Sequence, residues 1–233
     1  MPASNELAAD LIDRAVRNGQ HALSEHDSKK VLATYGIATV DEELVKTAAE
    51  AVEASQRLGY PVVLKACAPN LAHKSDRGLV AMNLDDAASV RAAVAEVAKR
   101  AGDTPLDGYL VQKMLRGKRE IIAGSTREKL FGPCVMLGLG GILVEALADV
   151  AFRLAPIEER DALEMINEIR AQRLFDAIRG EPAVDRGALS QVLIAVGRIL
   201  IENPRVAQVD VNPLIFEGAR PAAADALIAL TTE

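Results

Sequence analysis

Apolar residues recur every three or four positions in the segments 7–16, 24–35 and 47–58 of the chain. This spacing places them along one face of an α-helix. A glycine follows each segment, at positions 19, 36 and 59, where helices commonly end. Thr47 with Glu50 adds a capping-box pattern at the start of the third segment. We therefore predict three helices before residue 60.

Continuous or alternating apolar runs later in the chain predict β-strands. They fall at 60–66, 79–84, 109–114, 120–124, 134–137, 143–147 and 150–155, with a closing pair at 206–216 and 222–230. Helical patterns lie at 90–101, 157–170 and 185–201. Because helices and strands do not alternate strictly, the pattern predicts an α+β fold rather than a doubly wound sheet. The polar loop 103–108 is the predicted boundary between two subdomains, 1–108 and 109–233.

Composition narrows the class of protein. The chain has 233 residues, half of them hydrophobic but only 3% aromatic, so an aliphatic core is expected. The net charge is −6 and no basic stripe is present, which argues against nucleic acid as a partner. Cys67 and Cys134 form no CxxC pair and are expected to be buried, reduced thiols. Without a signal peptide or a run long enough to cross a membrane, a cytoplasmic location is predicted.

Lys65 ends the apolar run 60–65 and is soon followed by the polar segment 73–78. Lysine is a compact point charge that suits phosphate, although a strand-end lysine with its head in solvent is the alternative. His73 opens the polar segment. An imidazole can accept a phosphoryl group or relay protons, but a lone histidine in a loop is often simply exposed.

A glycine-rich turn, 138–141, follows the predicted strand 134–137. It fits a dinucleotide-binding fingerprint poorly. Its glycines would let the backbone approach phosphate, or they serve a tight turn. Glu145 and Arg153 lie beyond it, eight positions apart, and share a face only if one strand runs through both.

Three oxygen-bearing side chains lie near the end of the chain. Asp210 and Asn212 are two positions apart, so a strand would place them on one face. Pro213 is expected to end the regular ladder there, and Asp225 lies in the following segment. Such donors suit magnesium that bridges phosphates. An Asx turn at Asn212 and a solvated Asp225 are the alternative.

Together these strings resemble the ATP-grasp domain of the beta subunits of ADP-forming acyl-CoA (acetate–CoA) synthetases, relatives of succinyl-CoA synthetase beta chains. The matching strings run in family order from about residue 20 to residue 230. They are LGYPVVLK at 58–65, AHKSD at 72–76, FGP at 131–133, GLGG at 138–141, VE at 144–145, DVAFRLAP at 149–156, RG at 179–180, DVNPL at 210–214 and DA at 225–226. Each is weak alone, but the combination is specific.

The resemblance implies an ATP-grasp fold, with two α+β subdomains clamping ATP or ADP together with Mg²⁺. It implies nucleotide contacts by Lys65 at the phosphates, by the backbone of Val111, Gln112 and Lys113 at the adenine, by Glu120 near the ribose, and by Gly140 and Gly141. It implies metal ligation by Asn212 and Asp225, with Asp210 beside them and Glu145 as a further candidate. It implies catalytic roles for His73, Lys65 and Arg153, with His73 relaying a phosphoryl group to the nucleotide.

The implied activity is that of an ADP-forming acid–thiol ligase in which phosphate passes between acyl phosphate, a phosphohistidine and ADP. An alpha subunit with the CoA-binding and ligase domains is the implied partner, in an α2β2 assembly. Two alternatives stay open: a stand-alone ATP-grasp carboxylate ligase, and a non-catalytic nucleotide-sensing subunit. Leu79 stands where the family has glycine, and crowding of the phosphate loop by its side chain would favour the last.

Overall fold

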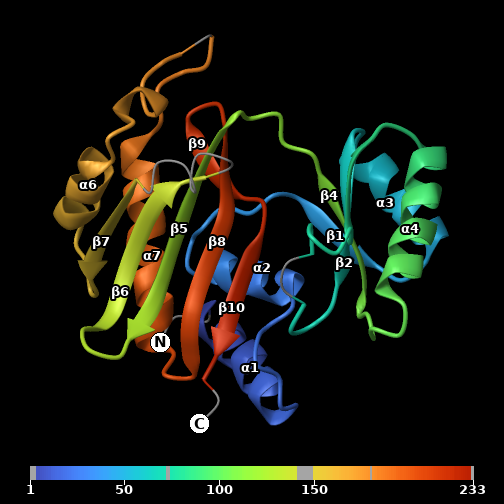
Figure 1. Cartoon of the computed structure of the whole chain (residues 1–233), viewed down its shortest axis with the longest axis horizontal. Helices are drawn as coiled ribbons and strands as arrows, with labels where there is room; N and C mark the ends of the chain where they lie inside the picture. The colour runs from blue at the N-terminus through green and yellow to red at the C-terminus, as the bar shows by residue number, and fades with distance from the viewer. Residues whose placement is uncertain (1–3, 72–73, 141–148, 179, 232–233) are drawn as a thin grey trace. The chain divides into compact units, whose positions relative to one another are not determined.

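The computed structural model describes residues 4–71, 74–140, 149–178 and 180–231. The chain forms two compact units (Figure 1). Unit 1 consists of Met1–Leu23, Asp27–Thr39 and Arg116–Glu233, and unit 2 consists of Ser24–His26 and Val40–Leu115. Both termini therefore belong to unit 1, and unit 2 is largely an insertion in its sequence.

Unit 2 is a four-stranded antiparallel sheet with two helices. The strand order is β1-β4-β2-β3, formed by β1 (Glu42–Val45), β4 (Gly108–Lys113), β2 (Val62–Cys67) and β3 (Val80–Leu84). Helices α3 (Ala48–Leu58) and α4 (Ala87–Ala101) pack on each other and on the sheet. Their buried faces and that of the sheet form one aliphatic core.

Both helices of unit 2 begin at a capping box. The amide of Glu50 donates to the Thr47 hydroxyl over 3.2 Å, and the amide of Ser89 donates to the Asp86 carboxylate over 2.7 Å. Each bond satisfies a helix N-terminal amide that has no partner within the helix. The predicted capping box at Thr47 is confirmed.

Unit 1 is built on a larger antiparallel sheet. Its strand order is β10-β8-β5-β6-β7, with β9 paired to β8. The strands are β5 (Arg119–Glu128), β6 (Gly132–Leu139), β7 (Val150–Leu154), β8 (Val206–Glu217), β9 (Arg220–Ala223) and β10 (Ala226–Leu230). The helices are α1 (Ser4–Arg17), α2 (Glu25–Thr34), α6 (Glu159–Glu168) and α7 (Arg186–Glu202), with a short 3-10 turn at Gln172–Leu174. The first two residues of α2 are counted with unit 2.

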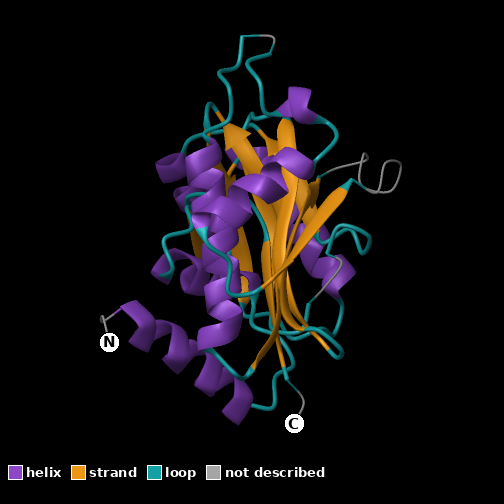
Figure 2. Ribbon diagram, turned by 90° about the vertical axis from the view of Figure 1, so that its left-hand side faces the viewer, coloured by secondary structure: helices purple, strands orange, loops and turns teal. Residues whose placement is uncertain are grey.

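The sheet of unit 1 has one face covered by helices. Ser125 of β5 lies opposite Val135 of β6, which lies opposite Arg153 of β7. The Ser125 hydroxyl donates to the Val196 carbonyl of α7 over 2.7 Å, so this row faces the helices. Figure 2 shows the helices layered beside the strands. Residues that alternate with this row lie on the other face, which we call the open face.

The open face is defined by a second row of opposed residues. Asp210 of β8 lies opposite Gly124 of β5, which lies opposite Met136 of β6 and then Phe152 of β7. Phe152 is 53% exposed. One end of this row is therefore acidic and the other is apolar.

Most predicted elements are present in the structure. The strand at 42–45 was not predicted, and the predicted strand 143–147 lies outside the described residues. The predicted boundary at residue 108 is wrong, since β4 pairs with β1 and β2 and so belongs to unit 2, and since the N-terminal helix α1 belongs to unit 1. Pro213 does not end β8, which continues to residue 217 past a register shift opposite β5.

Both cysteines are free and buried, as predicted. Burial raises the pKa of the Cys67 thiol to about 11, because the apolar surroundings disfavour the thiolate. No helix in the described part of the chain is long and apolar enough to cross a membrane.

Substitution of two leucines in unit 1 tests which residues form its hydrophobic core. Leu137 in β6 is fully buried, so Leu137→Ala is expected to lower the free energy of unfolding by about 2–5 kcal/mol. Leu130 at the β5–β6 turn is 88% exposed, so Leu130→Ala should change it by less than about 0.5 kcal/mol. Urea denaturation of both variants measures the difference. Equal losses in the two variants would contradict this assignment of the core.

Candidate functional site

Lys65 lies in a buried cluster of charges in unit 2. All six residues of β2 are buried, and the Lys65 ammonium donates to Oε1 of Glu25 over 2.7 Å. Lys74 donates to the other carboxylate oxygen of Glu25. The side chains of Lys65 and Glu25 are 7% and 2% exposed. The alternative of a strand-end lysine with its head in solvent is therefore wrong.

The polar segment after Lys65 folds back on β2. The amide of Leu79 donates to the Lys74 carbonyl over 2.8 Å, and the amide of Ala66 donates to the Leu79 carbonyl over 2.9 Å. The Leu79 side chain is fully buried in the core of unit 2. It packs among aliphatic residues instead of crowding segment 74–78. His73 lies outside the described residues.

The backbone of Val111 and Gln112 is occupied within the sheet. β4 is an interior strand, paired with β1 on one side and with β2 on the other through both residues. The amide of Lys113 donates to the Asp41 carbonyl over 3.0 Å. The residues that follow β4, from Met114 on, are not part of a strand until β5 begins. The predicted adenine contact through the backbone of 111–113 thus falls on a segment whose hydrogen bonds are used by the sheet.

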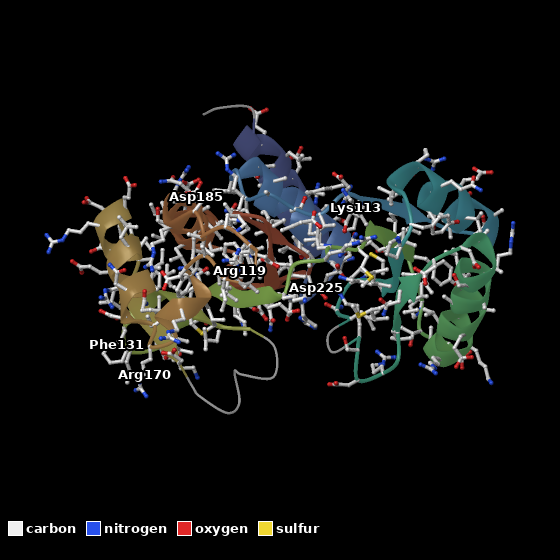
Figure 3. The ribbon with its side chains drawn as sticks, turned by 90° about the horizontal axis from the view of Figure 1, so that it is seen from above. Lys113, Arg119, Phe131, Arg170, Asp185 and Asp225 are labelled. Carbon is white, nitrogen blue, oxygen red and sulfur yellow. The ribbon has the colours of Figure 1, made fainter. Side chains whose placement is uncertain are left out.

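The predicted metal ligands of β8 and β10 come together in unit 1. Asp210 and Asn212 flank the fully buried Val211, so both lie on the open face. The amide of Asn212 donates to the carbonyl of Asp225, labelled in Figure 3, over 3.3 Å. Burial and the nearby negative charge of Asp225 raise the pKa of Asp210. The structure therefore places two carboxylates close enough to repel each other.

This acidic pair fits a divalent cation. Among the described residues, no three His, Cys, Asp or Glu side chains gather into a metal-binding cluster. Magnesium, however, takes one or two carboxylates and completes its shell with water and substrate phosphates. Asp210 and Asp225 supply two carboxylates, and the side-chain amide oxygen of Asn212 is a third possible oxygen donor. A bound cation would offset both the burial and the repulsion by Asp225 that raise the pKa of Asp210. Glu145, the further candidate ligand, lies outside the described residues.

Glu120, near the start of β5, and Gly140, just after β6, are neighbours at one end of the unit 1 sheet. Glu120 lies between Arg119 and Ile121, both buried on the helix side, so its side chain belongs to the open face. The amide of Gly140 donates to the Glu120 carbonyl over 2.8 Å. A Cβ atom on Gly140 would lie 2.7 Å from the Glu120 backbone, so this close approach requires glycine. Gly141 is not among the described residues.

Arg153 does not lie with the acidic pair. It belongs to the row that faces the helices, whereas Asp210 belongs to the open face. Its guanidinium forms ion pairs with Glu168 and, at 3.9 Å, with Glu164 of α6. These contacts raise the pKa of Arg153, chiefly through the hydrogen bond with Glu168. The observed role of Arg153 is to join β7 to α6.

Arg119 holds a loop that carries one of the family strings. Its guanidinium donates to the carbonyls of Pro182 and Gly218, each over 2.9 Å, and packs 5.8 Å above the centre of the Phe216 ring. In Figure 3 it lies among the packed side chains of unit 1. Arg119 thereby anchors the loop that includes Gly180.

Two members of the lysine cluster were missed by the sequence analysis. Lys74 was present in the polar segment, but only its neighbour His73 was selected. Glu25 lies 40 positions before Lys65, at the start of a predicted helix. An acidic residue in the first turn of a helix is common, because it interacts favourably with the helix dipole. Nothing local therefore distinguished Glu25 from a surface glutamate.

The fold and the charged clusters define an ATP-grasp domain. The family model described as "ATP-grasp domain" matches residues 14–230, and the chain belongs to this family. The predicted ATP-grasp fold is confirmed.

Similar proteins narrow the family further. The beta subunit of acetate–CoA ligase [ADP-forming] I from Pyrococcus furiosus is 38% identical over 227 residues, which cover 96% of this chain and 97% of the relative. A longer relative, acetate–CoA ligase [ADP-forming] I from Archaeoglobus fulgidus, is 36% identical; the match covers 91% of this chain and 31% of that protein.

Solved structures of related enzymes have the same fold. The dinucleotide-forming acetyl-coenzyme A synthetase 1 of Ca. Korarchaeum cryptofilum, in complex with coenzyme A and Ca-AMPCP, has a TM-score of 0.91 at 40% identity, covering 96% of this chain and 100% of that chain. A Mg-AMPPCP complex of the same synthetase, with its phosphohistidine segment pointing towards the nucleotide-binding site, has a TM-score of 0.83 at 40% identity and the same coverage. The predicted kinship with ADP-forming acetate–CoA ligase beta subunits is confirmed.

Asp210→Asn tests whether burial and the nearby charge of Asp225 make the ionised form of Asp210 unfavourable. Because the pKa of Asp210 is raised in the folded chain, its ionised form opposes folding above the usual carboxyl range. The variant is therefore expected to unfold at a higher temperature than the wild type at neutral pH in metal-free buffer. The gain should vanish below a pH of about 3.9, where Asp210 is protonated in both states.

Asp103→Asn, in an exposed loop of unit 2, is the matched control and should show no such pH-dependent gain. Thermal unfolding followed by circular dichroism at several pH values measures both variants. A loss of stability in Asp210→Asn at neutral pH would contradict a raised pKa of Asp210 in the folded chain.

Proposed function

We propose that this chain is the nucleotide-binding beta subunit of an ADP-forming acyl-CoA ligase, with the overall reaction carboxylate plus CoA plus ATP to acyl-CoA, ADP and phosphate. The observation that carries the proposal is the pair of buried lysines in a chain that matches such beta subunits over nearly its whole length. The acidic pair Asp210 and Asp225 supports it, because Mg²⁺ accompanies the phosphates of a nucleotide.

Lys65 and Lys74 are proposed to contact phosphate. An ammonium is a compact charge with three N–H donors. In a site shielded from water, its attraction for a phosphate oxygen is stronger than at an exposed surface. Phosphoryl transfer depends mainly on positioning and charge neutralisation, and two lysines that share one buried carboxylate meet both needs.

The open face of unit 1 is proposed to hold the metal. Asp210, Asn212 and Asp225 would bind Mg²⁺, which when bound neutralises charge on the phosphates. Glu120, on the same face, would lie near the ribose. Because the backbone groups of β4 are hydrogen-bonded to β1 and β2, we propose that the adenine contact lies in the segment that begins at Met114.

The partner is proposed to be an alpha subunit. Two relatives that match over 97% and 90% of their length bear the name "subunit beta", and in the longer relative this chain matches about a third of the protein. The partner would bind CoA and the carboxylate, and an α2β2 assembly in the cytoplasm is proposed. His73 would relay the phosphoryl group between the partner's phosphohistidine and the nucleotide. Arg153 would support this transfer indirectly, through its ion pairs with α6.

The decisive experiment is a reconstitution of the chain with its alpha partner. Acetate, CoA and Mg·ATP are expected to give ADP only when both subunits are present and only when CoA is added. Turnover by the isolated chain without CoA would instead indicate a stand-alone ATP-grasp ligase. A folded chain that binds no Mg·ATP in calorimetry would overturn the proposal.

His73→Ala separates binding from transfer. The variant is expected to bind Mg·ATP within about twofold of wild type but to lower ADP release by the reconstituted complex by at least about a hundredfold, since covalent relay needs the imidazole. His21→Ala, which removes the exposed imidazole of His21, is the control and should turn over normally. Unchanged turnover in His73→Ala would remove this residue from the mechanism.

A further inference from the structure

The carboxylate of Glu25 bridges the side chains of Lys65 and Lys74. Its Oε1 accepts from Lys65 over 2.7 Å, and its Oε2 accepts from Lys74. The three side chains are 2%, 7% and 10% exposed for Glu25, Lys65 and Lys74. The described residues thus contain a water-shielded charge cluster in which a single carboxylate is shared by two ammonium groups.

The three residues come from three separate parts of unit 2. Glu25 is the first residue of α2, Lys65 lies in β2, and Lys74 lies in the segment before β3. The helix N-terminus favours a negative charge at Glu25. The amide of Leu79 fixes the Lys74 carbonyl, and β2 is paired on both sides. The backbone at both lysines is therefore held by regular structure, whereas their long side chains need a further anchor.

A lysine side chain has four rotatable methylenes and loses much rotamer freedom when it is fixed in place. An anchor that is present before the ligand arrives removes that cost from ligand binding. Glu25 reaches both ammonium groups at once, one with each oxygen. Because an ammonium has three N–H donors, a bond to Glu25 is compatible with a bond from the same nitrogen to a phosphate oxygen.

We propose that Glu25 is a positioning residue that sets the spacing of Lys65 and Lys74 for adjacent phosphate oxygens of a nucleoside di- or triphosphate. The inference rests on the proposed function, because it takes the lysines to be the phosphate contacts. Glu25 itself does not touch the nucleotide. It acts by fixing the two cations that do, so its loss weakens binding of the phosphates and leaves binding of the nucleoside intact.

Glu25→Gln tests this role. The amide keeps the size of the side chain, but it has one acceptor oxygen instead of two and presents N–H donors to the second lysine. Affinity for Mg·ADP should fall by about tenfold to a hundredfold, the equivalent of one lost charge-assisted hydrogen bond. Affinity for adenosine, measured by calorimetry on the same preparation, should stay within about twofold.

Two further variants keep the test interpretable. Glu43→Gln removes another carboxylate of unit 2, one that pairs with Arg57 at the surface over 2.6 Å, and should leave both affinities unchanged. Glu25→Asp keeps the charge but shortens the side chain, so it should bind Mg·ADP more tightly than Glu25→Gln and less tightly than wild type. It also serves if Glu25→Gln fails to fold.

The outcomes separate the inference from the proposed function. Equal or tighter Mg·ADP binding by Glu25→Gln or Glu25→Asp would overturn the inference, because the carboxylate would then be irrelevant or a competitor of phosphate. Parallel losses for Mg·ADP and adenosine would overturn it too, since Glu25 would be a general structural residue. A folded wild type that binds adenosine but gains nothing from the phosphates would overturn the proposed function itself.

Discussion

The strand register of the sheet in unit 1 determines which side chains share a face and can act together. β5 lies between β6 and β8, and its pairing with both places Asp210 on the face opposite Arg153. The helices cover the face of Arg153, and a shift by one residue would exchange every side chain between the two faces. The three candidate metal ligands of unit 1 therefore lie on one face, and Arg153 with its ion pairs to α6 lies on the other.

In unit 2 the main constraint is different: it is the free energy cost of burying a charged side chain. Its β2 strand is buried throughout, yet it includes Lys65. A buried ion without partners is strongly unfavourable, and a buried pair is tolerated only when its hydrogen bonds are well made. Glu25 and Lys74 provide that environment. The same contacts that make Lys65 compatible with the interior also set its position, so stability and ligand chemistry depend on the same atoms.

Local patterns in the sequence were sufficient for most of the fold. The long helices and the aliphatic strands follow clear periodicities, and the string matches led to the family. The short strand β1 was missed because two glutamates begin it, and its pairing with β4 comes from a distant part of the chain. The unit boundary was missed because unit 2 is an insertion whose limits are set by strand pairing.

The candidate site was predictable to the extent that its residues lie close in sequence. Asp210 and Asn212 share a strand, so their common face could be inferred. Glu25 was out of reach, because its importance lies in contacts with residues 40 and 49 positions away. The sequence alone could not place Arg153 on a face for a related reason: alternation gives two faces but does not say which one the helices cover.

The insertion of unit 2 also has a consequence for the order in which the chain folds during synthesis. All four strands of unit 2 lie before residue 115, so its sheet can form while the ribosome has yet to make β8 and β10. Unit 1 must wait, because its core combines α1 with those last strands. Glu25 belongs to the early unit, so the charge cluster around Lys65 can assemble before the acidic pair of β8 and β10 exists.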